Sequence, residues 1–503
     1  MPHQRVNRTL LSPPAWLVIG AAIAVLSGCA NKKADATTTS AGTVEASAKI
    51  PITTASADAK ALYVQGRKLI EELRLHDGRA LFEQAVAKDP GFAMAHYYLA
   101  VSAPSAKART EEMNVAVAQS GTASEGERLM ILSLQARANA NPIKALQYVE
   151  QLAEKFPQDE RAHFALGTAF SGQQEYERAI AEFKQSIQID SSFSPAYNSL
   201  GYAYRPVGKF DEAEAVFKKY IQLVPNDPNP YDSYAELLMK IGRFDESIAQ
   251  YQKALSIDPH FSGSYVGIAT NRMFKGQHDE AIAEAQKLYD SARDDGERRT
   301  ALFSQAVTDV DAGKSELALK PLTAEYELDT RIADTANMSV DAVALGDVLL
   351  DAGKPDAARA KYSQALDLVT TSSQSADVKA DAKLADRYNQ ARVALAKHDR
   401  ATAQSDAADY ASGARARYDA FRISQAHELA GLIALDAQKF GVAAAELGQA
   451  NQQNPYVLYA LARAHRGAGD AAKARTFASA AANANALQTL PYAFVRMKAK
   501  KMA

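Results

Sequence analysis

Residues 197–225 read YNSLGYAYRPVGKFDEAEAVFKKYIQLVP, and this stretch decides the fold. The large Tyr197 is followed by Leu200 and the small Gly201, and an interval of 12 separates Gly201 from the small Ala213. Two helices can cross closely where small residues meet, while larger neighbours fill the groove around the crossing. The stretch therefore predicts two antiparallel helices that pack against each other.

The same pattern recurs with a period of about 34 residues, which marks a paired-helix repeat. Proline disfavours helix in the residue before it, so prolines between the units indicate where one pair ends and the next begins. These boundary residues are Pro157, Pro225 and Pro259. The interval of 12 between two small residues is kept in four successive units, at Gly167 and Ala179, Gly201 and Ala213, Ala235 and Ser247, and Ala269 and Ala281.

Residues 197–225 resemble the tetratricopeptide repeat, which has large, Leu, Gly, Tyr, Ala, Phe, Ala and Pro at fixed offsets. The stretch departs from that pattern at Tyr220, where Ala is usual. The resemblance implies an all-α fold, a right-handed superhelical solenoid of stacked antiparallel helix pairs. Weaker copies extend it, so we expect a repeat array over residues 58–291 and a degenerate array with a C-terminal helix over residues 295–503, roughly a dozen pairs in all.

The N-terminus has the pattern of a secretory signal. Arg5 and Arg8 precede an apolar run, residues 15–26, which is too short to span about 30 Å of hydrocarbon as a helix. The run ends in a motif that resembles the lipobox of bacterial lipoproteins: Leu26, Ser27, Gly28 and Cys29.

The lipobox resemblance implies cleavage before Cys29 and attachment of lipid to the Cys29 thiol. Residues 1–28 are then a lipoprotein signal peptide. Residues 29–57, rich in Thr, Ala and Ser, are expected to form a lipid-anchored flexible linker. Ala30 and Asn31 follow the box instead of the Asp typical of inner-membrane retention, so we expect the outer membrane, with the array facing the periplasm.

Composition and motifs argue against several kinds of activity. Lys and Arg total 57 against 59 Asp and Glu, so the chain lacks the basic character of nucleic-acid binders. It has no phosphate-binding loop, HExxH, GxGxxG or GxSxG motif. No two of the nine His residues have the helical spacing that would place them on one face for a metal. We therefore predict no catalytic residue, no cofactor and no metal site.

Some polar residues are expected to have structural roles. His163 and His427 occupy the large-residue position of a repeat, so packing is their expected role. The basic end of the chain is expected to be the solvated edge of the last helix: Arg496, Lys498, Lys500 and Lys501.

In proteins that resemble this one, the first helix of each pair lines a concave groove. Residues one, five and eight places after the large position are expected to point into it. Tyr and Arg are enriched in binding hot spots. These residues, called here the predicted groove, are Phe164, Thr168, Asn198, Tyr202, Arg205, Asp232, Glu236, Met239, Thr270 and Met273.

Two functions are compatible with the sequence. The first is a non-catalytic protein-binding scaffold or adaptor, held to the outer membrane by lipid, that recruits envelope proteins or peptides into a pilus, secretion, polysaccharide-export or assembly complex. The alternative is an envelope enzyme, or the dedicated activator of one, with a site in the irregular C-terminal half.

Overall fold

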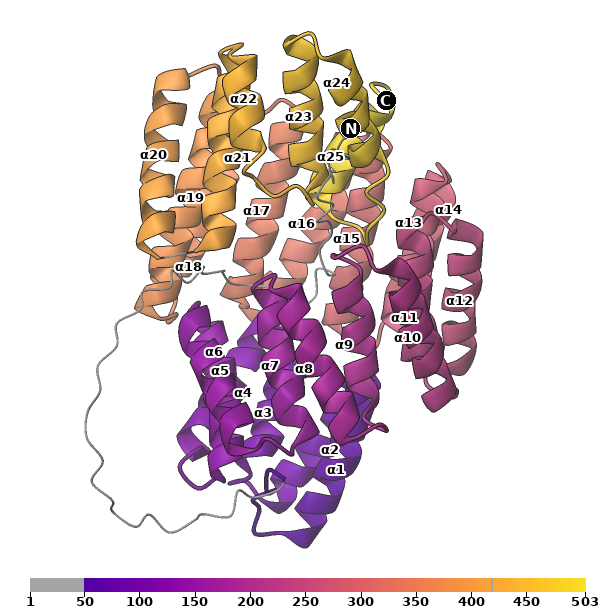
Figure 1. The fold of residues 1–503 in the computed structure, drawn as a ribbon. Helices are drawn as coiled ribbons and strands as arrows, with labels where there is room; N and C mark the ends of the chain where they lie inside the picture. The colour runs from indigo at the N-terminus through magenta and orange to yellow at the C-terminus, as the bar shows by residue number, and fades with distance from the viewer. Residues whose placement is uncertain (1–48, 418) are drawn as a thin grey trace, which may run out of the picture.

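The computed structural model describes residues 49–417 and 419–503. Every regular element in these ranges is an α-helix, so the predicted all-α solenoid is confirmed there (Figure 1). The helices follow one another as antiparallel pairs, and a single helix ends the chain. They are α1 (Ala57–Glu71), α2 (Leu75–Lys88), α3 (Ala93–Val101), α4 (Ala106–Gln119), α5 (Glu125–Ala138), α6 (Pro142–Lys155), α7 (Glu160–Gly172), α8 (Tyr176–Ile189), α9 (Ser194–Tyr204), α10 (Phe210–Leu223), α11 (Pro228–Lys240), α12 (Phe244–Ile257), α13 (Ser262–Phe274), α14 (His278–Ser291), α15 (Asp295–Asp311), α16 (Ser315–Ile332), α17 (Thr335–Asp351), α18 (Pro355–Thr371), α19 (Ala376–Ala396), α20 (Arg400–Ala416), α21 (Ala420–Asp436), α22 (Phe440–Leu447), α23 (Pro455–Gly467), α24 (Ala471–Ala482) and α25 (Leu490–Lys500).

The helix boundaries follow from local sequence. α9 ends at Tyr204 and α10 begins at Phe210, and Gly208 between them has a φ of +74°. Glycine reaches this backbone conformation easily because it has no Cβ. Pro225 separates α10 from α11, and Pro228 occupies the first turn of α11, where its missing N–H breaks no helical hydrogen bond.

The spacing of the pairs explains why the repeat is regular in one half only. The helices α7, α9, α11 and α13 begin at residues 160, 194, 228 and 262, so every step between them is the same. The helices α15, α17, α19 and α21 begin at residues 295, 335, 376 and 420, so the steps there are longer and unequal. α7 has 13 residues, whereas each helix from α15 to α21 has at least 17, so these helices are about one turn longer.

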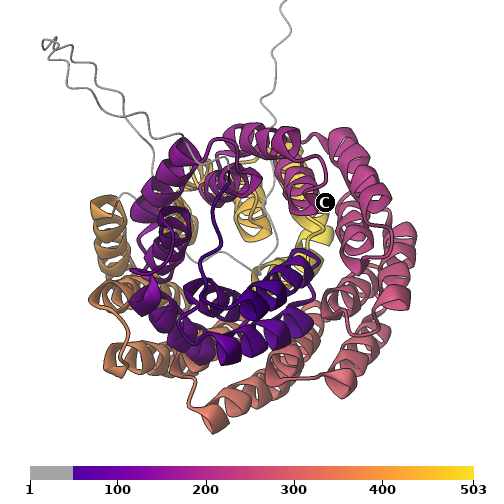
Figure 2. The same cartoon turned by 90° about the horizontal axis from the view of Figure 1, so that it is seen from below.

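The solenoid stacks on itself after one superhelical turn. Arg79 of α2 lies 3.4 Å from Asp294, which precedes α15, and the backbone N–H of Lys107 in α4 donates to Asp334 before α17 at 2.9 Å. Figure 1 shows the result as a lower tier, α1–α9, and an upper tier, α15–α24, and Figure 2 looks along the axis around which the helices are arranged. Contacts between distant repeats therefore fix the curvature of the array.

The last helix lies inside the upper tier rather than at its edge. α25 packs against α23 and α24, and also against α15 and α17 from the middle of the chain. Arg496 is only 5 % exposed and is paired with the buried Asp311 of α15. The prediction that the basic end is wholly solvated is therefore wrong for Arg496, because the superhelix brings α15 against the final helix.

The residues before α1 also make specific contacts. The backbone N–H of Ile50 donates to Asp159 at 2.6 Å, that of Thr53 to Glu127 at 3.0 Å, and that of Ala55 to Asp89 at 3.0 Å. The sequence analysis places these residues in a flexible linker. The structure instead holds the end of that linker along α7, α5 and the loop before α3.

The predicted signal peptide and lipobox, including Cys29, lie outside the described residues. Within the part that is described, no helix combines the length and apolar character needed to cross a membrane.

Candidate functional site

The predicted groove is far less accessible than the sequence suggests. None of its ten residues is exposed. Phe164, Thr168, Asn198, Tyr202 and Asp232 are half-buried. The other five are buried: Arg205, Glu236, Met239, Thr270 and Met273. Whether a partner binds these residues stays a prediction, and their surroundings divide them into three groups.

The first group is a closed network between α9 and α11. The Tyr202 hydroxyl donates to Glu236 Oε2 at 2.8 Å, and Arg205 Nη1 lies 2.8 Å from Glu236 Oε1. The Arg205 guanidinium also lies over the Tyr202 ring, 4.9 Å from its centroid. Arg205 and Glu236 are each 3 % exposed, so the tyrosine and arginine expected to bind a partner bind Glu236 instead.

Two titratable residues lie beside this network. The Ser264 hydroxyl donates to Asp232 at 2.7 Å, and burial raises the pKa of Asp232 to about 7. Burial, assisted by the charge of Arg205, lowers the pKa of Lys240 to about 7. The Lys240 ammonium donates to the carbonyl of Ala484, in the segment that leads to α25. The C-terminal end of the chain thus reaches the predicted groove at α11.

The second group is Met239, Thr270 and Met273, and its two methionines lie where the last helix packs. Met239 and Met273 share an apolar cluster with Leu490 and Phe494 of α25. The Gln488 amide, just before α25, donates to the Thr308 hydroxyl of α15 at 3.1 Å. The chain itself therefore fills this part of the predicted groove. The pattern of residues in the first helices of the pairs does not indicate this filling.

The third group, Phe164, Thr168 and Asn198, belongs to α7 and α9 and has no contact of this kind. The Phe164 ring packs on Phe183 and Phe193 of its own and the next pair, with centroids 5.9 and 5.5 Å apart. Asn198 Oδ1 is buried and accepts no hydrogen bond from the described residues. An unpaired buried carbonyl oxygen is costly, so Asn198 lowers the stability of this part of the array.

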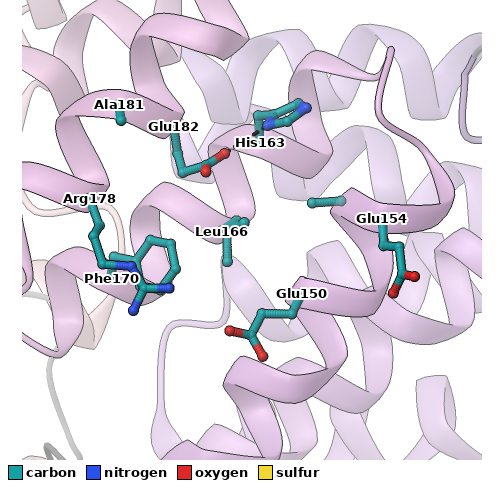
Figure 3. A pocket seen from close by; sticks show the side chains of 9 residues that line it. Glu150, Glu154, His163, Leu166, Phe170, Arg178, Ala181 and Glu182 are labelled. Carbon is teal, nitrogen blue, oxygen red and sulfur yellow. Dashed lines mark hydrogen bonds and ion pairs between the residues drawn. The ribbon is translucent and has the colours of Figure 1, made fainter. Parts of the chain in front are cut away.

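A separate pocket of about 380 Å³ lies between α6, α7 and α8 (Figure 3). Leu166 and Phe170 of α7 line it, and Glu150 and Glu154 project from α6. The Arg178 guanidinium from α8 lies over the Phe170 ring, 3.7 Å from its centroid. The sequence analysis did not single out this pocket, because its residues come from two neighbouring pairs and form no local motif.

The histidines at the large-residue position do pack, and they also make hydrogen bonds that the sequence analysis missed. His163 Nδ1 lies 2.7 Å from Glu182 Oε2, and His163 Nε2 lies 3.1 Å from the carbonyl oxygen of Pro157. Tyr231 occupies the equivalent position and donates to the carbonyl of Pro225 at 3.1 Å. His163 thus connects the loop before α7 to Glu182 of α8, which is a structural role.

A buried charged cluster in the upper tier was also missed. Arg299 makes two bonds of 2.9 Å to Asp341 and lies 3.0 Å from Glu325, and it is also paired with Asp329. Burial raises the pKa of Glu325 to about 8, and a raised pKa at Asp341 has the same first cause. The residues come from α15, α16 and α17, so only the tertiary fold brings three carboxylates around one guanidinium. Among the described residues, no group of three His, Cys, Asp or Glu side chains has the arrangement to hold a metal ion.

Comparison with known protein families tests the predicted repeats. Two family models described as tetratricopeptide repeat match the chain, one at residues 63–117 and 133–192, the other at residues 194–227 and 229–261. The chain contains tetratricopeptide repeats. Tetratricopeptide arrays are typically non-catalytic scaffolds for protein interactions, and these matches indicate no enzyme family.

Solved structures with similar folds each align with part of the array. MamA from Desulfovibrio magneticus RS-1 is 18 % identical, with 32 % of this chain and 92 % of that one covered and a TM-score of 0.28. TTC0263 from Thermus thermophilus is 22 % identical, with coverages of 42 % and 98 % and a TM-score of 0.28. YrrB, described as a tetratricopeptide protein with an unusual peptide-binding site, is 19 % identical, with coverages of 36 % and 92 % and a TM-score of 0.25. Among curated proteins, no match is found.

Proposed function

We propose that this tetratricopeptide protein is a non-catalytic scaffold that recruits other envelope proteins or peptides, and that lipid on Cys29 anchors it to the outer membrane. The single observation that carries the binding role is the contrast within the predicted groove. The chain's own last helix packs on Met239 and Met273, whereas Phe164, Thr168 and Asn198 of α7 and α9 are half-buried and lie outside the apolar cluster of that helix.

The open part of the predicted groove, Phe164, Thr168 and Asn198, offers the chemistry that a peptide needs. The Phe164 ring gives apolar surface, and the hydroxyl oxygen of the half-buried Thr168 can accept a backbone N–H. Concave surfaces that combine apolar area with a few polar groups are typical of binding sites. We place the partner here rather than at Tyr202 and Arg205, since these two already bind Glu236.

The anchoring role rests on the sequence before the array. A lipid-modified Cys29, followed by residues 30–48 and then by the fixed residues 49–55, would tether the array to the membrane from the side of α7. Several acyl chains on one cysteine would give stable attachment, because each buried CH₂ contributes about 0.8 kcal/mol.

Capture of partners from envelope extracts tests the proposal. A tagged full-length chain with Thr168→Arg should lose partners that the wild type retains, because a large charge would fill the open part of the predicted groove. Gln188→Arg, at an exposed position of α8, should retain them. Cys29→Ser should retain them in extracts but release the chain from membranes. If all three variants captured the same partners as the wild type, and if Cys29→Ser stayed attached to membranes, both parts of the proposal would be overturned.

A further inference from the structure

Residues 484–503, called here the C-terminal segment, occupy the position that a bound ligand would have on the array. After α24 ends at Ala482, the chain leaves the helix-pair pattern, runs without regular structure to Thr489 and then forms α25. α25 has no partner helix of its own. It packs instead against α15 and α17 of earlier pairs, as well as α23 and α24.

Apolar anchors hold one face of α25. Leu490, Phe494 and Val495 are buried in the cluster that contains Met239 and Met273. Leu490 and Phe494 are four residues apart, so they lie on the same side of the helix. On the same helix Lys498 and Lys500 are exposed, which makes α25 amphipathic. This is how a helical peptide sits in a groove, with anchors at helical spacing.

Polar anchors fix the position of the segment along the predicted groove. Lys240 of α11 donates to the backbone carbonyl of Ala484, and Gln488 donates to Thr308. Arg496 makes two hydrogen bonds to Asp311, at 2.7 and 2.9 Å, and also donates to the carbonyl of Met273 at 2.8 Å.

Asp311 sets the chemistry that any occupant of this surface must have. Its side chain is fully buried, and its other polar neighbour among the described residues is His278, whose Nε2 lies 2.9 Å from it. A buried carboxylate whose partner is removed is strongly destabilised. An occupant without a cation at this point would therefore bind poorly.

We propose that the surface formed by α11, α13, α15 and α17 is a second binding site, which recognises an amphipathic helix carrying two apolar anchors four residues apart and an arginine two residues after the second. The C-terminal segment occupies that site as an internal ligand. A partner helix of the same chemistry takes its place, so the segment limits access to this half of the array. This inference rests on the proposed scaffold function and adds the class of partner and its regulation.

A peptide-exchange experiment with the full chain tests this. A fluorescent peptide of residues 484–503 is titrated against the wild type and against a chain carrying Arg496→Ala, which weakens only the internal copy. We expect the peptide to bind the variant at least ten times more tightly than the wild type. The same peptide with Arg496→Ala should bind at least ten times more weakly, and adding Asp311→Asn to the chain should abolish the gain. Met497→Ala in the chain is the matched control and should behave as the wild type.

Hydrogen exchange of residues 484–503, measured in the same samples, shows whether the internal segment has been released. Release of the internal segment without binding of the peptide would overturn the proposal, as would binding that does not depend on Arg496 and Asp311. Leu490→Ala provides a second way to weaken the segment if Arg496→Ala does not fold. Loss of cooperative unfolding in both chains would show that the segment is an integral part of the fold and would also overturn the proposal. The peptide experiment uses no envelope partner, so its failure can be distinguished from a failure of the capture experiment with Thr168→Arg.

Discussion

Arg496 donates hydrogen bonds to both carboxylate oxygens of Asp311, a residue 185 positions earlier in the chain. The pair joins the last helix to the middle of the array, and both side chains are buried. Tetratricopeptide repeats interact mainly with their neighbours, so a contact at this separation exists only because the superhelix turns back on itself. It couples the stability of the upper tier to the end of the chain.

Removing one member of this pair should be costly. Arg496→Ala leaves Asp311 buried without its main partner, which typically costs about 3–5 kcal/mol. We expect urea unfolding followed by circular dichroism to show a loss of this size. Met497→Ala, on the exposed side of the same helix, should change the free energy of unfolding by less than about 0.5 kcal/mol. Equal effects of the two substitutions would show that the ion pair does not hold α25.

The close approach of the two helices within a pair can be tested at Gly201. A Cβ on Gly201 would lie 2.5 Å from the Phe217 ring, and Phe217 is fully buried. Gly201→Ala should therefore destabilise the array by about 1–3 kcal/mol in thermal or urea unfolding. At Gly172, also helical, a Cβ would meet no atom within 4 Å. Gly172→Ala should be neutral or slightly stabilising, because Ala is the better helix former. A tolerated Gly201→Ala would contradict the packing described for α9 and α10.

The turns within two successive pairs allow glutamine and glycine to be exchanged in both directions. Gln174 has a φ of +63°, whereas Gly208, at the same position of the next repeat, has a φ of +74°. The left-handed conformation disfavours residues with a Cβ, but glycine loses more entropy on folding. Gln174→Gly should therefore stabilise the array by about 0.5–1 kcal/mol, and Gly208→Gln should destabilise it by a similar amount. Both shifts can be read from the melting temperature, and shifts of the same sign would refute the explanation.

Stability should depend on pH through Glu325. Burial raises the pKa of Glu325 to about 8 from its ordinary 4.5, so the folded state binds the proton more tightly than the unfolded state. The stabilisation is complete below pH 4.5 and is lost as the pH rises towards 8. Glu325→Gln removes this titration, so its melting temperature should fall less between pH 5 and pH 8 than that of the wild type. Glu327→Gln, exposed on the same helix, is the control and should keep the wild-type slope. Identical slopes for all three proteins would exclude Glu325 as the titrating group.

The sequence was sufficient to predict the repeats and their turns. In α7 to α14 the helix pairs begin at a constant interval, so residues such as Gly201 and Ala213 recur in register. In α15 to α21 the helices are about one turn longer, which shifts the register and hides the pattern. The helices are still present there, because local amphipathic character survives a change in spacing.

The surroundings of the predicted groove could not be foreseen in the same way. The repeat pattern indicates which residues of a first helix share a face, but it contains no information about what covers that face. Tyr202 and Arg205 lie close together as predicted. However, Tyr202 donates a hydrogen bond to Glu236 of the next pair, and Arg205 forms an ion pair with the same carboxylate. Arg496 looks like a surface charge in the sequence, because its partner Asp311 is remote.

The most direct test of the central claim is site-specific photo-crosslinking in intact cells that produce the full-length chain. A photoreactive residue at Thr168, in the open part of the predicted groove, should yield discrete adducts with envelope proteins. The same residue at Gln188, exposed on α8, should yield none above background. Adducts at Gln188 with none at Thr168 would contradict a scaffold that binds its partners through the first helices of its tetratricopeptide pairs.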